Sequence, residues 1–190
     1  MELIRKQFEE AGKTLETFMN DDNNIRSVMK AGDLIVDAIS CGKKVISAGN
    51  GGSMCDAMHF AEEMTGRFRN DRHALPAIAI SDPSFISCAA NDFGYEKVFS
   101  RFIEGIGNNG DVFLAISTSG NSENIINAAL KAREKGLKVI GLTGKDGGVL
   151  AGLCDTEVRA PGSAYADRAQ EIHIKVIHTL ILYVESKLNL

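Results

Sequence analysis

The sequence predicts an α/β protein, a three-layer αβα sandwich on a five-stranded parallel sheet, with an N-terminal helical arm. Two amphipathic helical patterns come first, five short apolar runs follow after Gly42, and helical patterns separate most of these runs. Strands that alternate with helices specify a parallel sheet covered on both faces. The connections between such strands are expected to be right-handed.

The first 41 residues carry the two amphipathic helices, expected over 2–20 and 22–41. Apolar residues recur in both at the spacing of one helix face. They are Leu3, Ile4, Phe8, Ala11, Leu15 and Phe18 in the first helix, and Ile25, Val28, Met29, Leu34, Ile35 and Ile39 in the second. Asp21 and Asp22 lie where the first helix ends and the second is capped. Because this segment follows no strand, we expect residues 1–41 to form an oligomerisation arm that buries its apolar stripes against other subunits.

The rest of the chain, 42–190, is expected to form the sandwich. Its short apolar runs have the length and composition of strands. The expected strands are KVISAG, PAIAIS, DVFLAIS, LKVIGLTG and CDTEVRA, and the expected helices are 53–65, 82–91, 122–135, 147–152 and 168–188. No internal repeat or linker indicates a further domain.

Composition and charge exclude several classes of protein. The net charge is −4 and the basic residues are scattered, which argues against nucleic acid or an anionic membrane as the main partner. The four cysteines form no C-x-x-C pair, so they are expected to be reduced thiols. No apolar run approaches membrane-spanning length, and the N-terminus lacks the apolar core of a signal peptide. We therefore expect a cytoplasmic protein with a small-molecule ligand.

Ligands of open parallel sheets bind beyond the carboxyl ends of the strands, so the residues directly after each strand are candidates. The first strand leads through Asn50, Gly51 and Gly52 into a helix. Glycines let the backbone approach a ligand, and a helix N-terminus favours anions. The segment is not a dinucleotide fingerprint, because Met54 stands where the third glycine would be, and it is not a Walker A loop. A simple tight turn between strand and helix remains the alternative.

The third strand is followed by a cluster of hydroxyl side chains. Ser117, Thr118, Ser119 and Ser122 lie between this strand and the next helix. Hydroxyls and backbone N–H groups at a helix start suit a phosphate group without a metal or lysine. Alternatively, Asn121 or Ser122 caps the helix and the other residues form a turn. One residue can do both.

Two helices carry candidate metal ligands. His59 and Glu63 stand four residues apart on one helix, and Gln170 and His178 stand eight apart on the last, so each pair shares a helix face. Together they could close a metal site. Each pair alone has a simpler interpretation, as a surface ion pair or as ordinary polar positions. Their joint occurrence beside two ligand-type loops favours the metal site, and His173 is expected to point elsewhere.

The sequence allows two interpretations for each of two further segments. Asn91 and Asp92 follow the second helix of the sandwich and could contact a sugar or simply end the helix. Arg67, near the end of the helix that carries Glu63, could reach an anion, although an interaction with the helix dipole is the simpler interpretation.

The motifs AGNGGSMCDAMHFAEEMTGRF, AISTSGNS, LTGKDGG and RAQEIHIKVIH together resemble the phosphoheptose isomerases of the sugar isomerase (SIS) superfamily. The resemblance spans essentially the whole chain. STSGNS is typical of the superfamily, and HFAEE with QEIHIKVIH narrows the resemblance to this family. It implies a SIS fold and conversion of D-sedoheptulose 7-phosphate to D-glycero-D-manno-heptose 7-phosphate. This reaction is the first step towards ADP-heptose for lipopolysaccharide.

The resemblance also implies a homotetramer with one Zn²⁺ per subunit and sites that gather residues from neighbouring subunits. Matched by position, it assigns zinc to His59, Glu63, Gln170 and His178, acid–base catalysis to Glu63 and His178, and substrate contacts to Asn50, Gly51, Gly52, Glu63, Asn91, Asp92, Ser117, Thr118, Ser119, Ser122 and Gln170.

These residue types suit the implied chemistry. Moving a carbonyl from C2 to C1 removes a proton from C1, forms an enediol and returns a proton to C2, which needs a base of moderate pKa and an acid. Glu63 and His178 would supply both. A carboxylate bound to zinc is a weaker base, so Glu63 cannot be both a tight permanent ligand and an efficient base without rearrangement.

A rival function is that of a non-catalytic SIS-fold protein that regulates a partner, as certain bacterial proteins of this fold do by binding the replication initiator. A scaffold has no reason to keep both Glu63 and His178, so their joint presence favours the enzyme. A related isomerase or deaminase of another sugar phosphate would share the phosphate loop but not HFAEE with QEIHIKVIH.

Overall fold

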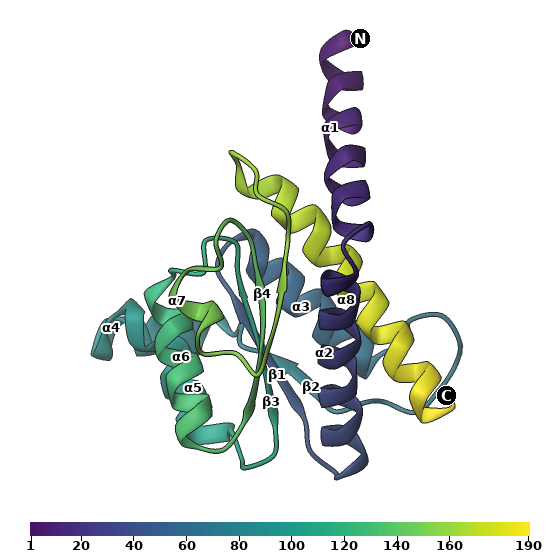
Figure 1. Ribbon diagram of the computed structural model, residues 1–190. Helices are drawn as coiled ribbons and strands as arrows, with labels where there is room; N and C mark the ends of the chain where they lie inside the picture. The colour runs from purple at the N-terminus through teal and green to yellow at the C-terminus, as the bar shows by residue number, and fades with distance from the viewer.

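The computed structural model describes residues 1–190. Its centre is one sheet of five parallel strands in the order β2-β1-β3-β4-β5 (Figure 1). The strands are β1 (Val45–Gly49), β2 (Ala77–Ala79), β3 (Val112–Ser117), β4 (Lys138–Thr143) and β5 (Thr156–Arg159). The predicted five-stranded parallel sheet is therefore confirmed.

Helices cover both faces of this sheet, so the predicted three-layer sandwich is also confirmed (Figure 1). One face is covered by α2 (Asp22–Ser40), α3 (Gly52–Thr65) and α8 (Ala166–Leu188), and the other by α4 (Pro83–Phe93), α5 (Val98–Ile106), α6 (Glu123–Glu134) and α7 (Gly148–Ala151). The helix α1 (Glu2–Met19) precedes them.

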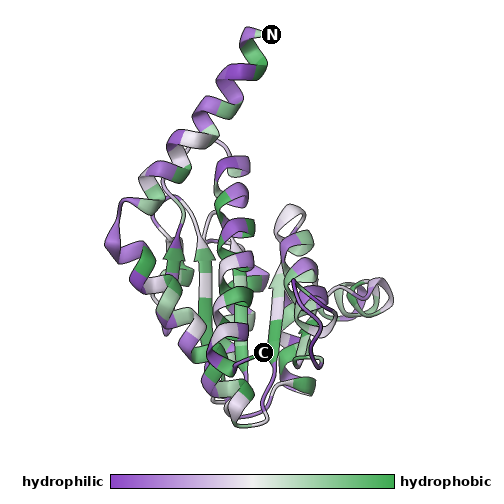
Figure 2. Cartoon of the chain, turned by 90° about the vertical axis from the view of Figure 1, so that its right-hand side faces the viewer, coloured by the Kyte–Doolittle hydropathy of each residue, from purple (hydrophilic) through white to green (hydrophobic).

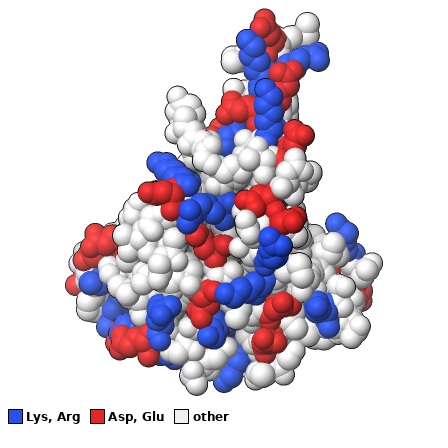
Figure 3. Space-filling view, in the orientation of Figure 1, with Lys and Arg blue, Asp and Glu red and all other residues white.

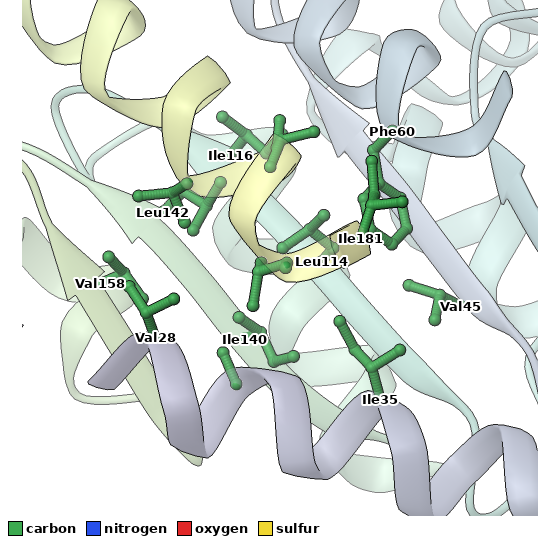
Figure 4. Packing of buried hydrophobic residues seen from close by; sticks show 14 of the residues in the cluster. Val28, Ile35, Val45, Phe60, Leu114, Ile116, Ile140, Leu142, Val158 and Ile181 are labelled. Atoms are coloured by element: carbon green, nitrogen blue, oxygen red, sulfur yellow. The ribbon is translucent and has the colours of Figure 1, made fainter. Parts of the chain in front are cut away.

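Alternation along the buried strands builds a separate core on each face. Val45 and Leu114 belong to the cluster under α2, α3 and α8, whereas their neighbours Ile46 and Phe113 belong to the cluster under α4, α5 and α6. Figure 4 shows the first cluster, with Ile35 of α2 reaching the sheet. Each such side chain is fully buried, which stabilises the fold by about 1.5–3 kcal/mol per residue.

One pair of elements was not predicted. A 3₁₀ turn (Tyr95–Lys97) leads directly into α5, in a stretch that the sequence analysis left without structure. The available signal was the helical spacing of Val98, Phe99, Phe102, Ile103 and Ile106. The preceding helix α4 also continues to Phe93, so the expectation that Asn91 and Asp92 follow this helix is wrong.

The two N-terminal helices behave differently. Ala31 and Ile35 of α2 are fully buried against the sandwich, whereas α1 projects from the body (Figures 1 and 2). The middle of α1 is tied to α8, because the Arg168 guanidinium donates hydrogen bonds to Gln7 Oε1 (2.8 Å) and Glu10 Oε1 (3.3 Å).

The distribution of charged side chains on the face shown and the hydropathy of the helices match the patterns in the sequence. Basic and acidic side chains are interspersed over the face shown in Figure 3. None of the helices has the length and apolar character needed to cross a bilayer.

The strand order fixes where a ligand can bind. From β1 the chain moves to β2 on one side, and the later strands are added on the other side, so the order reverses between β1 and β3. Ligands of open α/β sheets bind at such a switch point, beyond the carboxyl ends of the strands. The loops after β1 and β3 flank this point, and they are the two loops singled out in the sequence.

The buried His173 makes stability depend on pH. Its Nε2 lies 2.8 Å from the Thr143 carbonyl oxygen, Nδ1 has no partner, and burial lowers the pKa of the imidazole to about 4 from its ordinary 6.5. The fold therefore favours the neutral ring, and this contribution to stability is complete above pH 6.5 and is lost as the pH falls towards 4.

We expect the wild type to lose about 2 kcal/mol of unfolding free energy through this group between pH 7.5 and pH 5. A His173→Gln variant cannot titrate there and should lose correspondingly less. Urea unfolding at both pH values, at one protein concentration, measures the difference. Equal pH dependence in the two proteins would contradict the assignment.

Candidate functional site

The loop after β1 brings the backbone of α3 close to α8. Gly51 has a φ of +54°, a conformation that glycine adopts without strain. At Gly52, a Cβ atom would lie only 2.5 Å from Gln170 Nε2. Glycine at this position therefore lets the Gln170 side chain of α8 rest directly on the start of α3.

Asn50 links this loop to α6. Its amide exchanges two hydrogen bonds of 2.9 Å with the amide of Asn124, a buried residue in the first turn of α6. The Tyr95 hydroxyl also donates to Asn50 Oδ1 (3.0 Å). Asn124 and Tyr95 were not among the predicted site residues. A paired amide leaves no signal in a sequence, because its partner is set by the fold.

The loop after β3 is braced by its own residues and by the segment before α7. The Ser117 hydroxyl donates to Ser122 Oγ (3.1 Å), and the Asn121 N–H donates to Ser119 Oγ (3.1 Å). At Gly120, φ is +64° and a Cβ atom would collide with the Gly147 carbonyl oxygen. The Ser117–Ser122 segment is thus held closely against Gly147 and the start of α7.

Ser122 occupies the N-cap position of α6, but its side chain makes no capping hydrogen bond. Asn121 does not cap α6 either, because its Oδ1 accepts from the Val149 N–H (3.1 Å), so the structure shows no side-chain cap from Asn121 or Ser122 at this helix start. The first N–H groups of a helix have no intrahelical acceptor, so they remain available to an anion. Thr118 and Ser119 are partly exposed beside them.

Three predicted residues from α3 and α8 converge. His59 Nε2 lies 2.9 Å from His178 Nε2 and 3.6 Å from Glu63 Oε1. The side chains of His59 and Glu63 are 34% and 18% exposed, so the cluster is reachable from solvent. Burial and then the neighbouring His59 lower the pKa of His178, which keeps this imidazole neutral near pH 7.

Two acidic residues beside this cluster were not predicted. Glu62 Oε1 lies 3.2 Å from His59 Nδ1, the ring nitrogen that faces away from His178. Asp56, one turn before His59, has a buried Oδ2 without a partner, and burial raises the pKa of this carboxyl to about 6. Both lie on the helix already chosen, so helical spacing could have indicated them.

The chain is similar to known proteins over almost its whole length. Two family models, both described as the SIS domain, match residues 7–144 and 107–184. The phosphoheptose isomerase of Proteus mirabilis (strain HI4320) is 61% identical over 188 residues, which cover 99% of this chain and 98% of that protein. The chain belongs to the phosphoheptose isomerase family. The predicted resemblance, the SIS fold and the prediction of an isomerase enzyme are thereby confirmed.

Solved phosphoheptose isomerases have the same fold. The structure from Neisseria gonorrhoeae has a TM-score of 0.91 at 35% identity and covers 97% of this chain and 98% of its own. The structure from Francisella tularensis has a TM-score of 0.92 at 32% identity, with 97% of each chain covered.

A single phosphoheptose isomerase chain brings only part of the expected site together. His59 Nε2 approaches both His178 and Glu63, and ligand atoms of His59, Glu62 and Glu63 lie within 4.8 Å of one another, a set of imidazole and carboxylate groups that could hold a metal ion. Gln170 stands eight residues before His178, about 12 Å along the axis of α8, and its side chain lies at Gly52 instead.

Asn91 and Asp92 stand apart from this cluster. Both are exposed in the last turn of α4, where the Asn91 amide donates to Asp92 Oδ1 (2.9 Å) and the Cys88 thiol to Asp92 Oδ2 (3.6 Å). Their connection to the site runs through Tyr95, just after α4, which bonds Asn50.

Proposed function

We propose that this phosphoheptose isomerase converts D-sedoheptulose 7-phosphate to D-glycero-D-manno-heptose 7-phosphate through an enediol, in the cytoplasm, as the first step of ADP-heptose synthesis. The observation that carries the proposal is the approach of a carboxylate and an imidazole, Glu63 and His178, to His59 Nε2 between α3 and α8. An aldose–ketose isomerase needs these two groups to move a proton between C1 and C2.

The phosphate group is assigned to the Ser117–Ser122 loop. Its hydroxyls, with Thr118 and Ser119 partly exposed, would donate to the phosphate oxygens, and the N-terminus of α6 favours negative charge. The loop after β1 at Asn50, Gly51 and Gly52, together with Asn91 and Asp92, would contact the sugar hydroxyls. Glu63 stands eleven residues after Gly52, about 16 Å along the axis of α3, so the shared site proposed below would have to bring together the phosphate loop and the α3–α8 cluster of different subunits.

Glu63 would take the proton from C1 and return it at C2, while His178 would serve the substrate oxygens as the acid. We assign one Zn²⁺ per subunit to His59, Glu63, Gln170 and His178, of which Gln170 would have to come from a neighbouring subunit because it lies at Gly52 within one chain. When bound, the ion would stabilise negative charge that develops on the substrate oxygens. The Glu62 carboxylate at His59 Nδ1 supports this assignment, because carboxylates commonly orient metal-binding histidines in this way.

We further propose a homotetramer with sites at subunit interfaces. Leu3, Ile4 and Phe8 form an apolar stripe on the projecting part of α1, and each of them is exposed. An apolar groove between the root of α1, α2 and α8 is lined by residues that include Phe18, Val28 and Val176. Helices of neighbouring subunits would cover both surfaces.

The central test compares the wild type with Glu63→Gln on sedoheptulose 7-phosphate, with the product identified by NMR. The variant removes the basicity of the carboxylate but keeps its shape, so we expect kcat to fall about 10²–10⁴-fold. Exchange of the C1 proton with deuterated water should fall in parallel. Zinc content is measured on the same samples, and Glu104→Gln, an exposed carboxylate of α5, is the matched control. A zinc-loaded Glu63→Gln variant with wild-type rate would exclude Glu63 as the base.

The phosphate assignment predicts a defect in substrate binding. Ser119→Ala removes a hydrogen bond to a charged group, which should lower kcat/KM about tenfold or more, mainly through KM. Urea unfolding should change little, because Ser119 is partly exposed. Ser186→Ala, in the last turns of α8, controls for the same chemical change. Unchanged kinetics in Ser119→Ala would move the phosphate to another site.

The assembly proposal predicts a mass about four times that of the 20.5 kDa chain by light scattering at micromolar concentration. Phe8→Asp introduces a charge into the apolar stripe of α1 and should shift the mass towards smaller species. Lys6→Glu, an exposed change on the same helix, should leave the mass unaltered. A monomeric wild type would refute both the tetramer and the shared site.

A further inference from the structure

Arg72 closes the end of α3 that carries Glu63. Its guanidinium donates to the carbonyl oxygens of Glu63 (2.8 Å), Met64 (2.8 Å) and Gly66 (3.1 Å). The last carbonyls of a helix have no N–H partner within the helix, so they need such an external donor. One buried side chain thus fixes the backbone position of Glu63 itself.

The same guanidinium also binds α8. Arg72 Nε donates to Glu185 Oε1 at 2.7 Å, and the two side chains are only 3% and 8% exposed. Glu185 stands seven residues after His178, about two turns along the same helix. Arg72 therefore connects the backbone at Glu63 to the helix that carries His178.

A buried ion pair is a weak source of stability, because desolvation of both charges offsets much of their attraction. A well-packed apolar pair of similar volume is often equally stable. An apolar pair does not fix an orientation, whereas the planar guanidinium donates to a carboxylate and to four carbonyl groups, that of His73 included, at set angles. The contacts of Arg72 therefore specify how α3 and α8 lie relative to each other.

We propose that Arg72 and Glu185 are positioning residues of the isomerase, which hold α3 against α8 so that Glu63 and His178 meet at the substrate. This inference rests on the proposed roles of Glu63 and His178. Neither positioning residue touches the cluster through its side chain. Arg72 acts through the backbone of Glu63, and Glu185 acts through α8, which carries His178.

The test replaces the pair as a whole, with Arg72→Met combined with Glu185→Leu, so that no buried charge is left without a partner. The double variant leaves the carbonyl groups at the end of α3 without their donor, so its unfolding midpoint in urea should fall, and its kinetics are compared without urea, where it is folded. Its kcat should fall about 10–100-fold with little change in KM, because the reacting groups are misplaced while the phosphate loop is intact. Its zinc affinity, measured by competition with a chromogenic chelator, should fall by a similar factor.

The matched control is the exposed pair of α5, Arg101→Met with Glu104→Leu, which should keep wild-type kcat and zinc affinity. If the double variant of the buried pair does not fold, Arg72→Lys takes its place. This variant keeps a positive charge beside Glu185 but cannot reach all the carbonyl groups, so the same losses are expected.

A folded double variant, or a folded Arg72→Lys variant in its place, with wild-type kcat and zinc affinity would overturn the inference and reduce the pair to a structural contact. The proposed function would survive that result as long as Glu63→Gln remains inactive. Conversely, a fully active Glu63→Gln variant would remove the proposed function, whatever the Arg72 variants do.

Discussion

The site depends above all on the parallel packing of α3 against α8. Phe60 of α3 and Ile181 of α8 are fully buried in one core cluster between these helices and the sheet (Figure 4). Both helices begin at the carboxyl edge of the sheet, so residues at similar depth meet. Three links follow at intervals of about two turns: Gly52 with Gln170, His59 with His178, and the end of α3 with Glu185 through Arg72. A shift of α3 along α8 would displace all three of these contacts together.

The two halves of the site are held in different ways. Hydrogen bonds among Ser117, Ser119, Asn121 and Ser122 brace the loop after β3, and Gly120 packs against Gly147 and the start of α7. Such a loop suits a phosphate group, whose position does not change during an isomerisation. The α3–α8 cluster instead consists of side chains that project from two helices and remain partly exposed. Proton transfer is assigned to this cluster, whose side chains can change conformation more easily than the loop can.

The sequence predicted the sandwich because alternation between strands and helices depends on local patterns alone. It also grouped His59, Glu63, Gln170 and His178, since helical spacing and family motifs both indicate them. The structure places His59 next to Glu63 and His178 but leaves Gln170 at Gly52. It missed α5, whose apolar spacing lies between Gly94 and Gly107 in a short segment. It also missed Asn124 and Arg72, because their partners lie 74 and 113 residues away and only the fold brings them together. The assignment of zinc to His59, Glu63, Gln170 and His178 remains a prediction.

The contacts of Glu63 bear on whether one carboxylate can serve both zinc and substrate. Its Oε1 is 3.6 Å from His59 Nε2, beyond hydrogen-bond range, and its carboxylate has no hydrogen-bond donor of its own in the chain. Glu62, in contrast, approaches the other nitrogen of His59 to 3.2 Å. The Glu63 backbone is meanwhile fixed by Arg72 at 2.8 Å. A fixed backbone with an uncommitted carboxylate allows rotation about the side-chain bonds, so Glu63 could fill both of its proposed roles, as metal ligand and as base, without movement of α3.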